Sequence, residues 1–333
     1  MNTNIAVIGC GIWGRNLVRN FYNLGALHTV CDLDADTRTM IEKDYPGVKT
    51  VSDINEIFNS KEIHGVIIAT PSHTHYNLVK KALLAGKDVY VEKPIATCSI
   101  ESEELTRIAD EKGLVLMVGH LLLYHPAVNR LKTLVEEGVL GNISYVSSDR
   151  LNINFFRNDR SVMWDLAPHD VSMISYILGS NPKKVRSANG TATNNDGMFD
   201  IVHLDLEYPD NILAHIVTSW IHPVKRVVLI VKGSKATAVL DDAEAVNKLQ
   251  IFDSSIAGKV SVETPEYVDI EPLKLECQHF INCIINRIKP RSDGENGLAA
   301  VQALEEAEKM LLGANYNKIH SLKFSESRKN KVH

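Results

Sequence analysis

Asp165 and His169, an aspartate and a histidine four positions apart, are the residues whose types and spacing best suit proton chemistry. At the start of a predicted helix this spacing places both side chains on one face. The carboxylate can orient the imidazole and stabilise its charge, and an imidazole can remove a proton near neutral pH. Two other interpretations stay open: the pair could bind a metal, and Asp165 could cap the helix.

A glycine-rich segment near the N-terminus predicts a dinucleotide site. Gly9, Gly11 and Gly14 follow a predicted strand and open a predicted helix, as in a dinucleotide-binding fingerprint. Gly9 permits a tight turn, Gly11 lets a pyrophosphate approach the backbone, and Gly14 lets the helix pack on the strand. An ordinary glycine turn is the alternative. Asp32 argues against it, because a carboxylate at the end of the second strand can bind ribose hydroxyls.

The same aspartate indicates which cofactor is bound. Asp32 would repel the 2′-phosphate of NADP and no arginine follows it directly, so NAD is favoured. Lys93 follows another predicted strand at the same sheet edge, where it could reach the nicotinamide and a substrate hydroxyl. Burial beside the positive nicotinamide ring would lower the pKa of such a lysine toward a value useful in acid–base catalysis. The alternative is an exposed loop lysine.

The segment after the strand at 65–69 lies at this carboxyl edge too, and it contributes Thr70, Pro71 and His75. His73 and His75 could form a metal pair. The loop offers no nearby acidic or cysteine third ligand, so cofactor contact or helix capping is preferred for His75. No metal site is predicted.

These residues must be positioned by a parallel sheet in the first 120 residues. Apolar runs alternate there with amphipathic stretches, which is typical of strands joined by crossover helices. The predicted strands are 5–8, 27–31, 65–69, 88–91 and 114–118. The predicted helices are 13–24, 35–45, 54–58, 76–85 and 100–112.

Beyond about residue 140 the hydrophobic period changes. Short segments alternate apolar with polar residues and are joined by turn-rich links, which is typical of an antiparallel sheet with one covered face. The predicted strands are 143–150, 184–191, 199–206, 212–220, 226–231 and 236–240. The predicted helices are 127–137, 166–178, 274–287 and 297–312.

Composition excludes several classes of function. The 333 residues are 44% hydrophobic and 23% charged, as in globular proteins, and no apolar run approaches the roughly 18 residues of a membrane span. The net charge of −5 and the lack of a long basic run exclude nucleic-acid and membrane partners. The five cysteines are scattered, which predicts neither disulfides nor a zinc cluster. No signal peptide is recognisable, so a cytoplasmic location is expected.

Together the motifs resemble those of the glucose-fructose oxidoreductase, inositol dehydrogenase and MocA-like (Gfo/Idh/MocA) oxidoreductases. The resemblance covers nearly the whole chain: the glycine fingerprint, residues 69–71, 92–94 and 118–120, and the Asp165 and His169 pair. It implies an α/β fold with an N-terminal Rossmann parallel sheet and a C-terminal α+β domain with an open, mostly antiparallel sheet. The expected domains are 1–121 for NAD binding, 122–325 for substrate binding and oligomerisation, and a tail at 326–333.

The resemblance also implies an NAD-dependent dehydrogenase acting on a CH–OH group. His169 would remove the hydroxyl proton, Lys93 would steady the alkoxide and Asp165 would hold the imidazole. Residues 150–170, 220–223 and 272–276 are similar to the subgroup that oxidises the 3-hydroxyl of UDP-N-acetylglucosamine, or of its uronic acid, giving a 3-keto sugar nucleotide for 2,3-diamino sugar synthesis. The alternatives are an inositol or free-sugar dehydrogenase and, last, a non-enzymatic NAD-responsive binding protein.

The residues expected at the site follow from the motifs and the resemblance together. The expected cofactor-binding residues are Gly9, Gly11, Ile12, Trp13, Gly14, Asp32, Thr70, Pro71, His75, Glu92, Lys93 and His120. The expected substrate-binding residues are Lys93, Arg157, Asp165 and His169. Arg157 is chosen over Arg150 and Arg160 as the partner of a diphosphate, which suits the guanidinium fork. A homo-dimer or homo-tetramer is expected.

Overall fold

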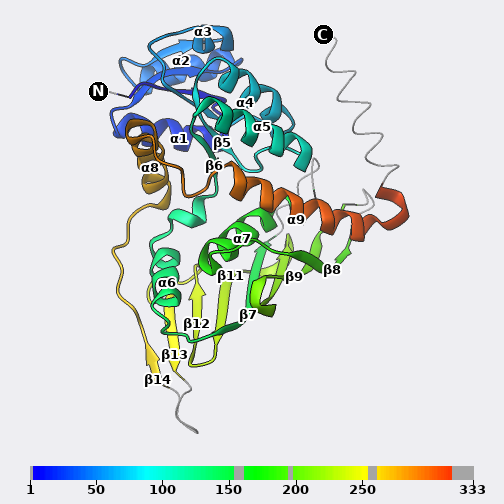
Figure 1. The fold of residues 1–333 in the computed structure, drawn as a ribbon. Coiled ribbons are helices and arrows are strands. Elements are labelled where there is room, and N and C mark those ends of the chain that lie inside the picture. The colour runs from blue at the N-terminus through cyan, green and yellow to red at the C-terminus, as the bar shows by residue number, and fades with distance from the viewer. Residues whose placement is uncertain (1–2, 154–160, 194–197, 254–260, 317–333) are drawn as a thin grey trace. The chain divides into compact units, whose positions relative to one another are not determined.

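The computed structural model describes residues 3–153, 161–193, 198–253 and 261–316 (Figure 1). Contacts divide the described residues into two compact units. The first comprises the chain up to Val139 with Val171–Gly179 and Thr264–Gln302, and the second comprises Leu140–Asp170, Ser180–Glu263 and the residues from Ala303 onward. The division of the chain at residue 121 stays a sequence-based prediction.

A six-stranded parallel sheet forms the centre of the first unit, in the order β3-β2-β1-β4-β5-β6. The strands are β1 (Ile5–Ile8), β2 (Leu27–Cys31), β3 (Lys49–Val51), β4 (Gly65–Ile68), β5 (Asp88–Glu92) and β6 (Leu116–Gly119). The parallel sheet predicted from the sequence is confirmed. The strand order reverses between β1 and β4, the place where ligands of such sheets bind beyond the carboxyl ends.

The helices of this unit cover both faces of the sheet. They are α1 (Ile12–Asn23), α2 (Ala35–Asp44), α3 (Ile54–Phe58), α4 (His75–Leu84), α5 (Ser99–Lys112) and α8 (Pro272–Asn286). Helix α6 (Pro126–Glu136) also belongs to this unit and follows β6. Right-handed crossovers place α1 and α4 on opposite faces. Helix α1 packs beside α8, where the rings of Phe21 and Phe280 meet edge to face with centroids 6.4 Å apart. Burying each such ring stabilises the fold by roughly 1.5–3 kcal/mol.

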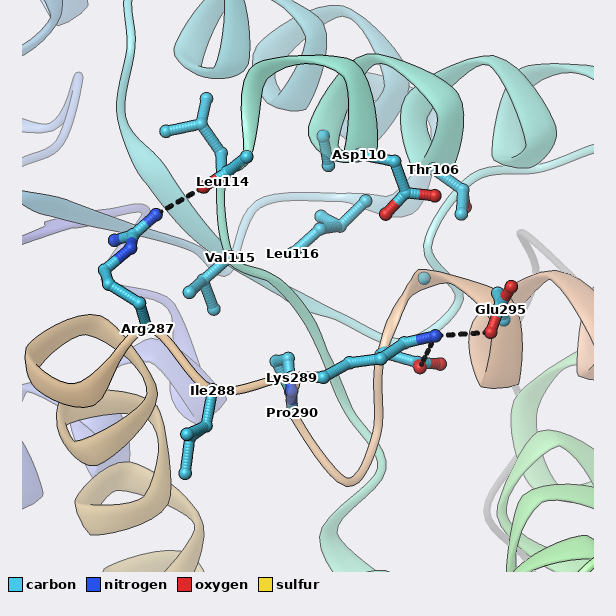
Figure 2. A pocket seen from close by; sticks show the side chains of 14 residues that line it. Thr106, Asp110, Leu114, Val115, Leu116, Arg287, Ile288, Lys289, Pro290 and Glu295 are labelled. Atoms are coloured by element: carbon cyan, nitrogen blue, oxygen red, sulfur yellow. Dashed lines mark hydrogen bonds and ion pairs between the residues drawn. The ribbon is translucent and has the colours of Figure 1, made fainter.

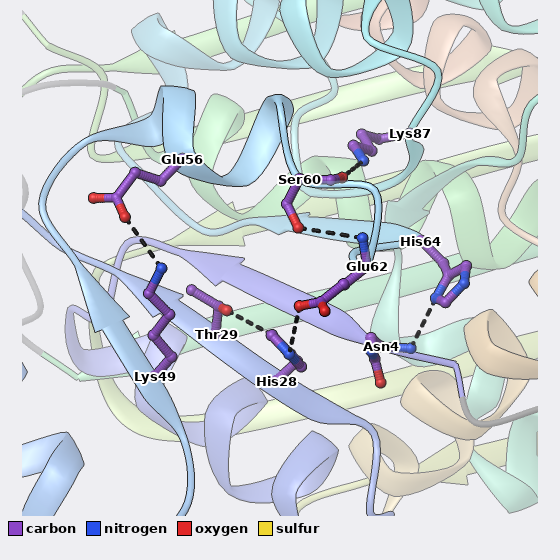
Figure 3. A network of polar contacts seen from close by, with 9 residues as sticks. All are labelled: Asn4, His28, Thr29, Lys49, Glu56, Ser60, Glu62, His64 and Lys87. Carbon is purple, nitrogen blue, oxygen red and sulfur yellow. Dashed lines mark hydrogen bonds and ion pairs between the residues drawn. The ribbon is translucent and has the colours of Figure 1, made fainter.

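Polar contacts close the amino-terminal edge of the sheet (Figure 3). The backbone N–H of Asn4 donates to Nδ1 of His64 at 3.1 Å. The ammonium of Lys87 donates to the carbonyl oxygens of Ser60 and Ile63. Lys87 is buried, and burial lowers the pKa of its ammonium. These contacts tie together the starts of β1, β4 and β5, so the candidate site is sought at the opposite, carboxyl edge.

An eight-stranded sheet forms the centre of the second unit, in the order β14-β13-β12-β11-β7-β10-β9-β8. The strands are β7 (Ile143–Ile153), β8 (Lys184–Thr191), β9 (Ile201–Glu207), β10 (Leu213–Ser219), β11 (Ile221–Gly233), β12 (Ala236–Asp241), β13 (Leu249–Asp253) and β14 (Ser261–Glu263). Only the pairing of β7 with β10 is parallel among these described strands. The predicted open, mostly antiparallel sheet is confirmed.

Two longer helices contribute residues to both units. These are α7 (Val162–Leu178) and α9 (Gly294–Leu312), and α7 carries the predicted aspartate and histidine. In the described part of the chain no helix has the length and apolar character that crossing a membrane requires.

Candidate active site

The glycine fingerprint adopts the turn that its sequence predicts. Gly9 has a φ of +91°, and a Cβ on Gly14 would lie 2.1 Å from the carbonyl oxygen of Gly9. Packing within the chain therefore explains why both positions are glycine. A Cβ on Gly11 would meet no atom of the described chain within 4 Å. The space beside Gly11 is therefore open to a group that approaches the backbone from outside, and a pyrophosphate fits there.

Asp32 lies beside this turn. Its Oδ2 accepts a hydrogen bond of 2.6 Å from the backbone N–H of Cys10, and its Oδ1 accepts one of 3.0 Å from Asp34. The carboxylate is thereby held at the carboxyl ends of β1 and β2, where it can reach ribose hydroxyls. Ile12 and Leu33 beside it expose 93% and 88% of their surface, although both are apolar. These residues fit a dinucleotide.

Trp13 links the fingerprint helix to the residue before Lys93. Its indole N–H donates to Oε1 of Glu92 at 2.5 Å, and the hydroxyl of Tyr90 donates to the same oxygen at 3.1 Å. Oε2 of Glu92 accepts from the backbone N–H of Lys93 at 3.3 Å. Burial raises the pKa of the Glu92 carboxyl, and the Trp13 hydrogen bond and the Lys93 charge oppose that rise. The fingerprint and the Lys93 backbone are thus connected through one carboxyl group.

His120 follows β6 directly beside this segment, because Gly119 pairs with Glu92. The side chain is buried, and neither ring nitrogen has a hydrogen-bond partner among the described residues. Burial, aided by the positive charge of Lys93, lowers the pKa of His120 to about 3. The imidazole is therefore neutral at physiological pH and lies within range of the charge of Lys93.

The loop after β4 holds Thr70, Pro71 and His75. Pro71 is exposed and Thr70 is half-buried, so both remain available to a ligand at this edge. His75 is buried, and each of its ring nitrogens lies within 2.8 Å of a backbone carbonyl oxygen. A nitrogen that donates to a carbonyl does not bind a metal at the same time, so this geometry does not favour a metal pair with His73. Within the described ranges no group of three or more suitable side chains could hold a metal ion.

Asp165 and His169 lie one turn apart on α7, as the sequence predicts. Asp165 is buried and His169 is half-buried. Pro168 stands between them inside the helix and cannot donate a backbone hydrogen bond to the preceding turn. These residues belong to the second unit and Lys93 belongs to the first. The predicted substrate ligand Arg157 lies outside the described residues.

The two parts of the chain match two related protein families. Residues 3–120 match the family described as "Oxidoreductase family, NAD-binding Rossmann fold", and residues 128–239 match the "GFO/IDH/MocA C-terminal domain". The chain belongs to the Gfo/Idh/MocA oxidoreductase family. The predictions of this family, of an enzyme and of a nicotinamide cofactor are therefore confirmed.

This Gfo/Idh/MocA oxidoreductase is similar in sequence to a sugar-nucleotide dehydrogenase and to a hydratase. The chain is 28% identical to UDP-N-acetylglucosamine 3-dehydrogenase from Acidithiobacillus ferrooxidans over 311 residues, which cover 89% of this chain and 93% of that protein. It is 25% identical to 2,7-anhydro-N-acetylneuraminate hydratase from Mediterraneibacter gnavus over 265 residues, 74% of this chain and 69% of that protein. The solved structure of the Acidithiobacillus dehydrogenase has a TM-score of 0.83, with 93% of this chain and 98% of that chain covered at 23% identity. That likeness shows a common fold.

The structure of this Gfo/Idh/MocA oxidoreductase contains an ion pair, between Arg150 and Asp170, that the sequence did not predict. Asp170 follows His169 and is fully buried. Nε and Nη2 of Arg150 each donate to its carboxylate at 2.9 Å, and the hydroxyl of Ser148 donates at 2.8 Å. The ion pair fastens α7 to β7 immediately after the candidate base. The sequence shows Arg150 only as a possible phosphate ligand, because nothing in the local pattern reveals its partner.

A second carboxyl group is also missing from the predicted set. Glu276 on α8 is fully buried, and neither of its carboxyl oxygens has a hydrogen-bond partner by distance and angle among the described residues. Burial and the negative charge of Glu92 raise the pKa of Glu276 well above its usual value, against a smaller opposing effect of Tyr90. Glu276 therefore retains its proton where an exposed glutamate has lost it.

This proton makes stability depend on pH. The folded state binds this proton more tightly than the unfolded state does. The proton's contribution to the free energy of unfolding is therefore complete below about pH 4.3 and declines as the pH rises toward the raised pKa of Glu276. Glu276→Gln keeps the shape and cannot titrate. We expect the free energy of unfolding of the variant, relative to the natural chain, to rise between pH 5 and pH 8 by up to about 1.4 kcal/mol per pH unit. Urea denaturation across this range measures it, and parallel curves would contradict it.

The structure also contains a surface pocket between the end of α5, the start of β6 and the segment from α8 to α9 (Figure 2). Its cations are already paired. Lys289 contacts Asp293 at 3.0 Å and Glu295 at 2.5 Å. Arg287 donates to Asp88 at 2.7 Å. The pocket lies at the amino end of β6 and contains none of the predicted site residues. It is not the candidate active site.

Proposed function

We propose that the chain is an NAD-dependent dehydrogenase that oxidises the 3-hydroxyl of a UDP-N-acetylhexosamine. The product is a 3-keto sugar nucleotide, suited to the synthesis of 2,3-diamino sugars. The observation that carries the dehydrogenase chemistry is the hydrogen bond from Trp13 to Glu92, which connects the fingerprint helix to the segment of Lys93. The sugar nucleotide is supported by the Acidithiobacillus relative, whose similarity extends over 89% of this chain.

Each candidate catalytic residue has one task. His169 removes the proton of the secondary hydroxyl, and Asp165 orients the imidazole and stabilises its positive charge. The ammonium of Lys93 stabilises negative charge as it develops on the hydroxyl oxygen. NAD held by the glycine fingerprint and Asp32 would supply the acceptor for the hydride that leaves the sugar carbon.

Substrate oxidation tests this proposal directly. The purified protein is incubated with NAD and, separately, with UDP-N-acetylglucosamine, UDP-N-acetylglucosaminuronate or myo-inositol, and NADH is followed by absorbance. We expect NADH with UDP-N-acetylglucosamine and competitive inhibition by UDP. Reduction with the uronic acid alone identifies the alternative sugar-nucleotide dehydrogenase. Reduction with myo-inositol and no inhibition by UDP identifies an inositol or free-sugar dehydrogenase. If none reacts, even with a 2-oxoacid present to recycle tightly held NADH, the proposed substrate class is wrong.

The preference for NAD over NADP rests on Asp32 at the end of β2. Asp32→Ala removes both the acceptor for the ribose hydroxyls and the charge that repels a 2′-phosphate. We expect the Kd of NADH to rise about tenfold and that of NADPH to stay level or fall, since one charge-assisted hydrogen bond contributes about 1.5–3 kcal/mol. Titrations that follow the fluorescence of each reduced cofactor measure both constants.

Asp34→Ala is the matched control for Asp32→Ala. Asp34 is also an aspartate of this loop, but its carboxylate caps α2 by accepting from the backbone N–H of Thr37 at 3.0 Å. Its removal should leave the ratio of the two dissociation constants unchanged. The same ratio in Asp32→Ala and the natural chain would show that Asp32 does not select the cofactor.

We also propose a homo-dimer or homo-tetramer in which the open face of the second sheet forms the contact. On that face Val217, Ile230 and Val239 are half-exposed, whereas their neighbours along the strands are buried. Light scattering coupled to size exclusion determines the mass in solution, and a monomer at micromolar concentration would exclude this assembly.

A further inference from the structure

We propose that His75 is a positioning residue that fixes the nucleotide-binding turn relative to Lys93. The inference rests on the proposed catalytic role of Lys93. His75 is the first residue of α4 and exposes 1% of its surface. Its Nδ1 lies 2.7 Å from the carbonyl oxygen of Pro94, and its Nε2 lies 2.8 Å from the carbonyl oxygen of Thr70. One buried ring therefore contacts the loops that follow two neighbouring strands, β4 and β5.

The chemistry of the ring defines both contacts. A carbonyl oxygen only accepts, so a hydrogen bond at either position requires a proton on the ring nitrogen that faces it. A neutral imidazole donates at one of the two positions, and an imidazolium donates at both. Pro94 is buried, and leaving a buried carbonyl without a donor is unfavourable. Nδ1 of His75 faces this carbonyl at 2.7 Å, so we assign a ring proton to Nδ1, where it donates to the residue immediately after Lys93.

The Thr70 side of this connection leads to the glycine fingerprint. Cγ2 of Thr70 lies 2.9 Å from the position that a Cβ on Gly9 would occupy, so Thr70 packs tightly on the turn. The hydroxyls of Thr70 and Thr74 are 2.6 Å apart, and that of Thr74 donates to Pro71 at 2.7 Å. The loop that presents the Thr70 carbonyl is thus fastened both to the turn and to itself.

The Pro94 side of this connection leads to Lys93. After Pro94 the chain enters the core, since Ile95 and Ala96 are fully buried. The Lys93 backbone therefore lies between the Glu92 carboxyl on one side and the carbonyl held by His75 on the other. A lysine side chain is flexible, so its reach depends on a fixed backbone, and a displacement of about 1 Å at a reacting group can reduce a rate about 100-fold. His75 supports cofactor and substrate chemistry through this backbone.

Two conservative substitutions separate the two contacts. The amide nitrogen of asparagine can take the place of Nδ1, and that of glutamine can take the place of Nε2. His75→Asn therefore keeps a donor for Pro94, and His75→Gln keeps a donor for Thr70. His75→Ala removes both ring contacts. His73→Ala is the matched control, because His73 is an exposed histidine of the same loop.

Hydrogen exchange measured by mass spectrometry tests the connection without any substrate. We expect amides in peptides spanning 93–98 to exchange at least tenfold faster in His75→Gln and His75→Ala. In His75→Asn and His73→Ala they should stay within about twofold of the natural chain. Unchanged exchange in both His75→Gln and His75→Ala would overturn the inference, whatever the substrate proves to be.

Steady-state kinetics then test the role of this connection in catalysis. We expect His75→Gln to lower kcat about tenfold or more with little change in the KM of the sugar nucleotide, and His75→Asn to restore most of kcat. If both variants lose thermal stability equally and retain the kcat of the natural chain, His75 is only structural and the proposal is wrong. Faster exchange in a protein that oxidises none of the sugars supports the connection and rejects the proposed function.

Discussion

Lys93→Ala and His169→Ala should each lower kcat by about 100-fold or more while NADH still binds. Lys93 supplies the positive charge that stabilises the alkoxide, and His169 supplies the base, so each acts mainly in the transition state. Loss of such an interaction appears in kcat rather than in the affinity for cofactor. Stopped-flow measurement of NADH formation gives kcat, and titration of NADH fluorescence gives the Kd.

Lys81→Ala provides the control for these variants. Lys81 is an exposed lysine of α4 in the same unit as Lys93, and it is not among the candidate site residues. Its kcat should match that of the natural chain within about twofold. Turnover at the natural rate in either Lys93→Ala or His169→Ala would refute the role proposed for that residue.

Arg150→Ala should destabilise the fold by about 3–5 kcal/mol, because it leaves the carboxylate of Asp170 buried without its cationic partner. Asp170 has no exposed surface and the side chain of Arg150 is 12% exposed, so solvent screens the pair weakly. The remaining donor, Ser148, is neutral. Urea denaturation followed by circular dichroism measures the loss.

The double substitution Arg150→Met with Asp170→Leu separates two contributions to the free energy of unfolding. One is the attraction between the two charges, and the other is the penalty for burying the Asp170 carboxylate without a partner. Apolar side chains of similar volume often replace a buried ion pair at little cost. We therefore expect the double variant to recover most of the stability that Arg150→Ala loses. A loss below about 1 kcal/mol in Arg150→Ala would mean that the buried carboxylate is compensated in another way.

Local pattern predicted the elements that carry the strongest hydrophobic period. The predicted strands at 5–8 and 27–31 coincide with β1 and β2, and the predicted helix at 35–45 extends one residue beyond α2. The prediction omits β13, which has five residues, β3, which has three residues and one buried side chain, and β14, which is as short as β3 and exposed. Such strands are defined by hydrogen bonds to a neighbour, and the alternation of a few residues carries too little information to reveal them.

The individual site positions were predictable because each lies in a motif, whereas the contacts between them were not. The Trp13 indole and the Glu92 carboxyl are 79 positions apart, and they meet because β1, β4 and β5 are adjacent in one sheet. Glu276 lies even farther along the chain from Trp13 and Glu92 than these two lie from each other. Its carboxyl is buried, whereas a glutamate on a helix ordinarily predicts an exposed side chain. Only packing between distant segments distinguishes these residues from surface ones.

The packing of α8 against the first sheet has a consequence for synthesis of the chain. Phe280 and Ile284 lie in the same core as Ile5 and Phe21, although more than two hundred residues separate them along the chain. A nascent chain that has emerged only to residue 139 contains every strand of that sheet and lacks the helix that covers this apolar face. Until α8 has been translated, we expect this apolar face to be exposed and to bind a chaperone. We expect a chain that stops before Pro272 to be prone to aggregation for the same reason.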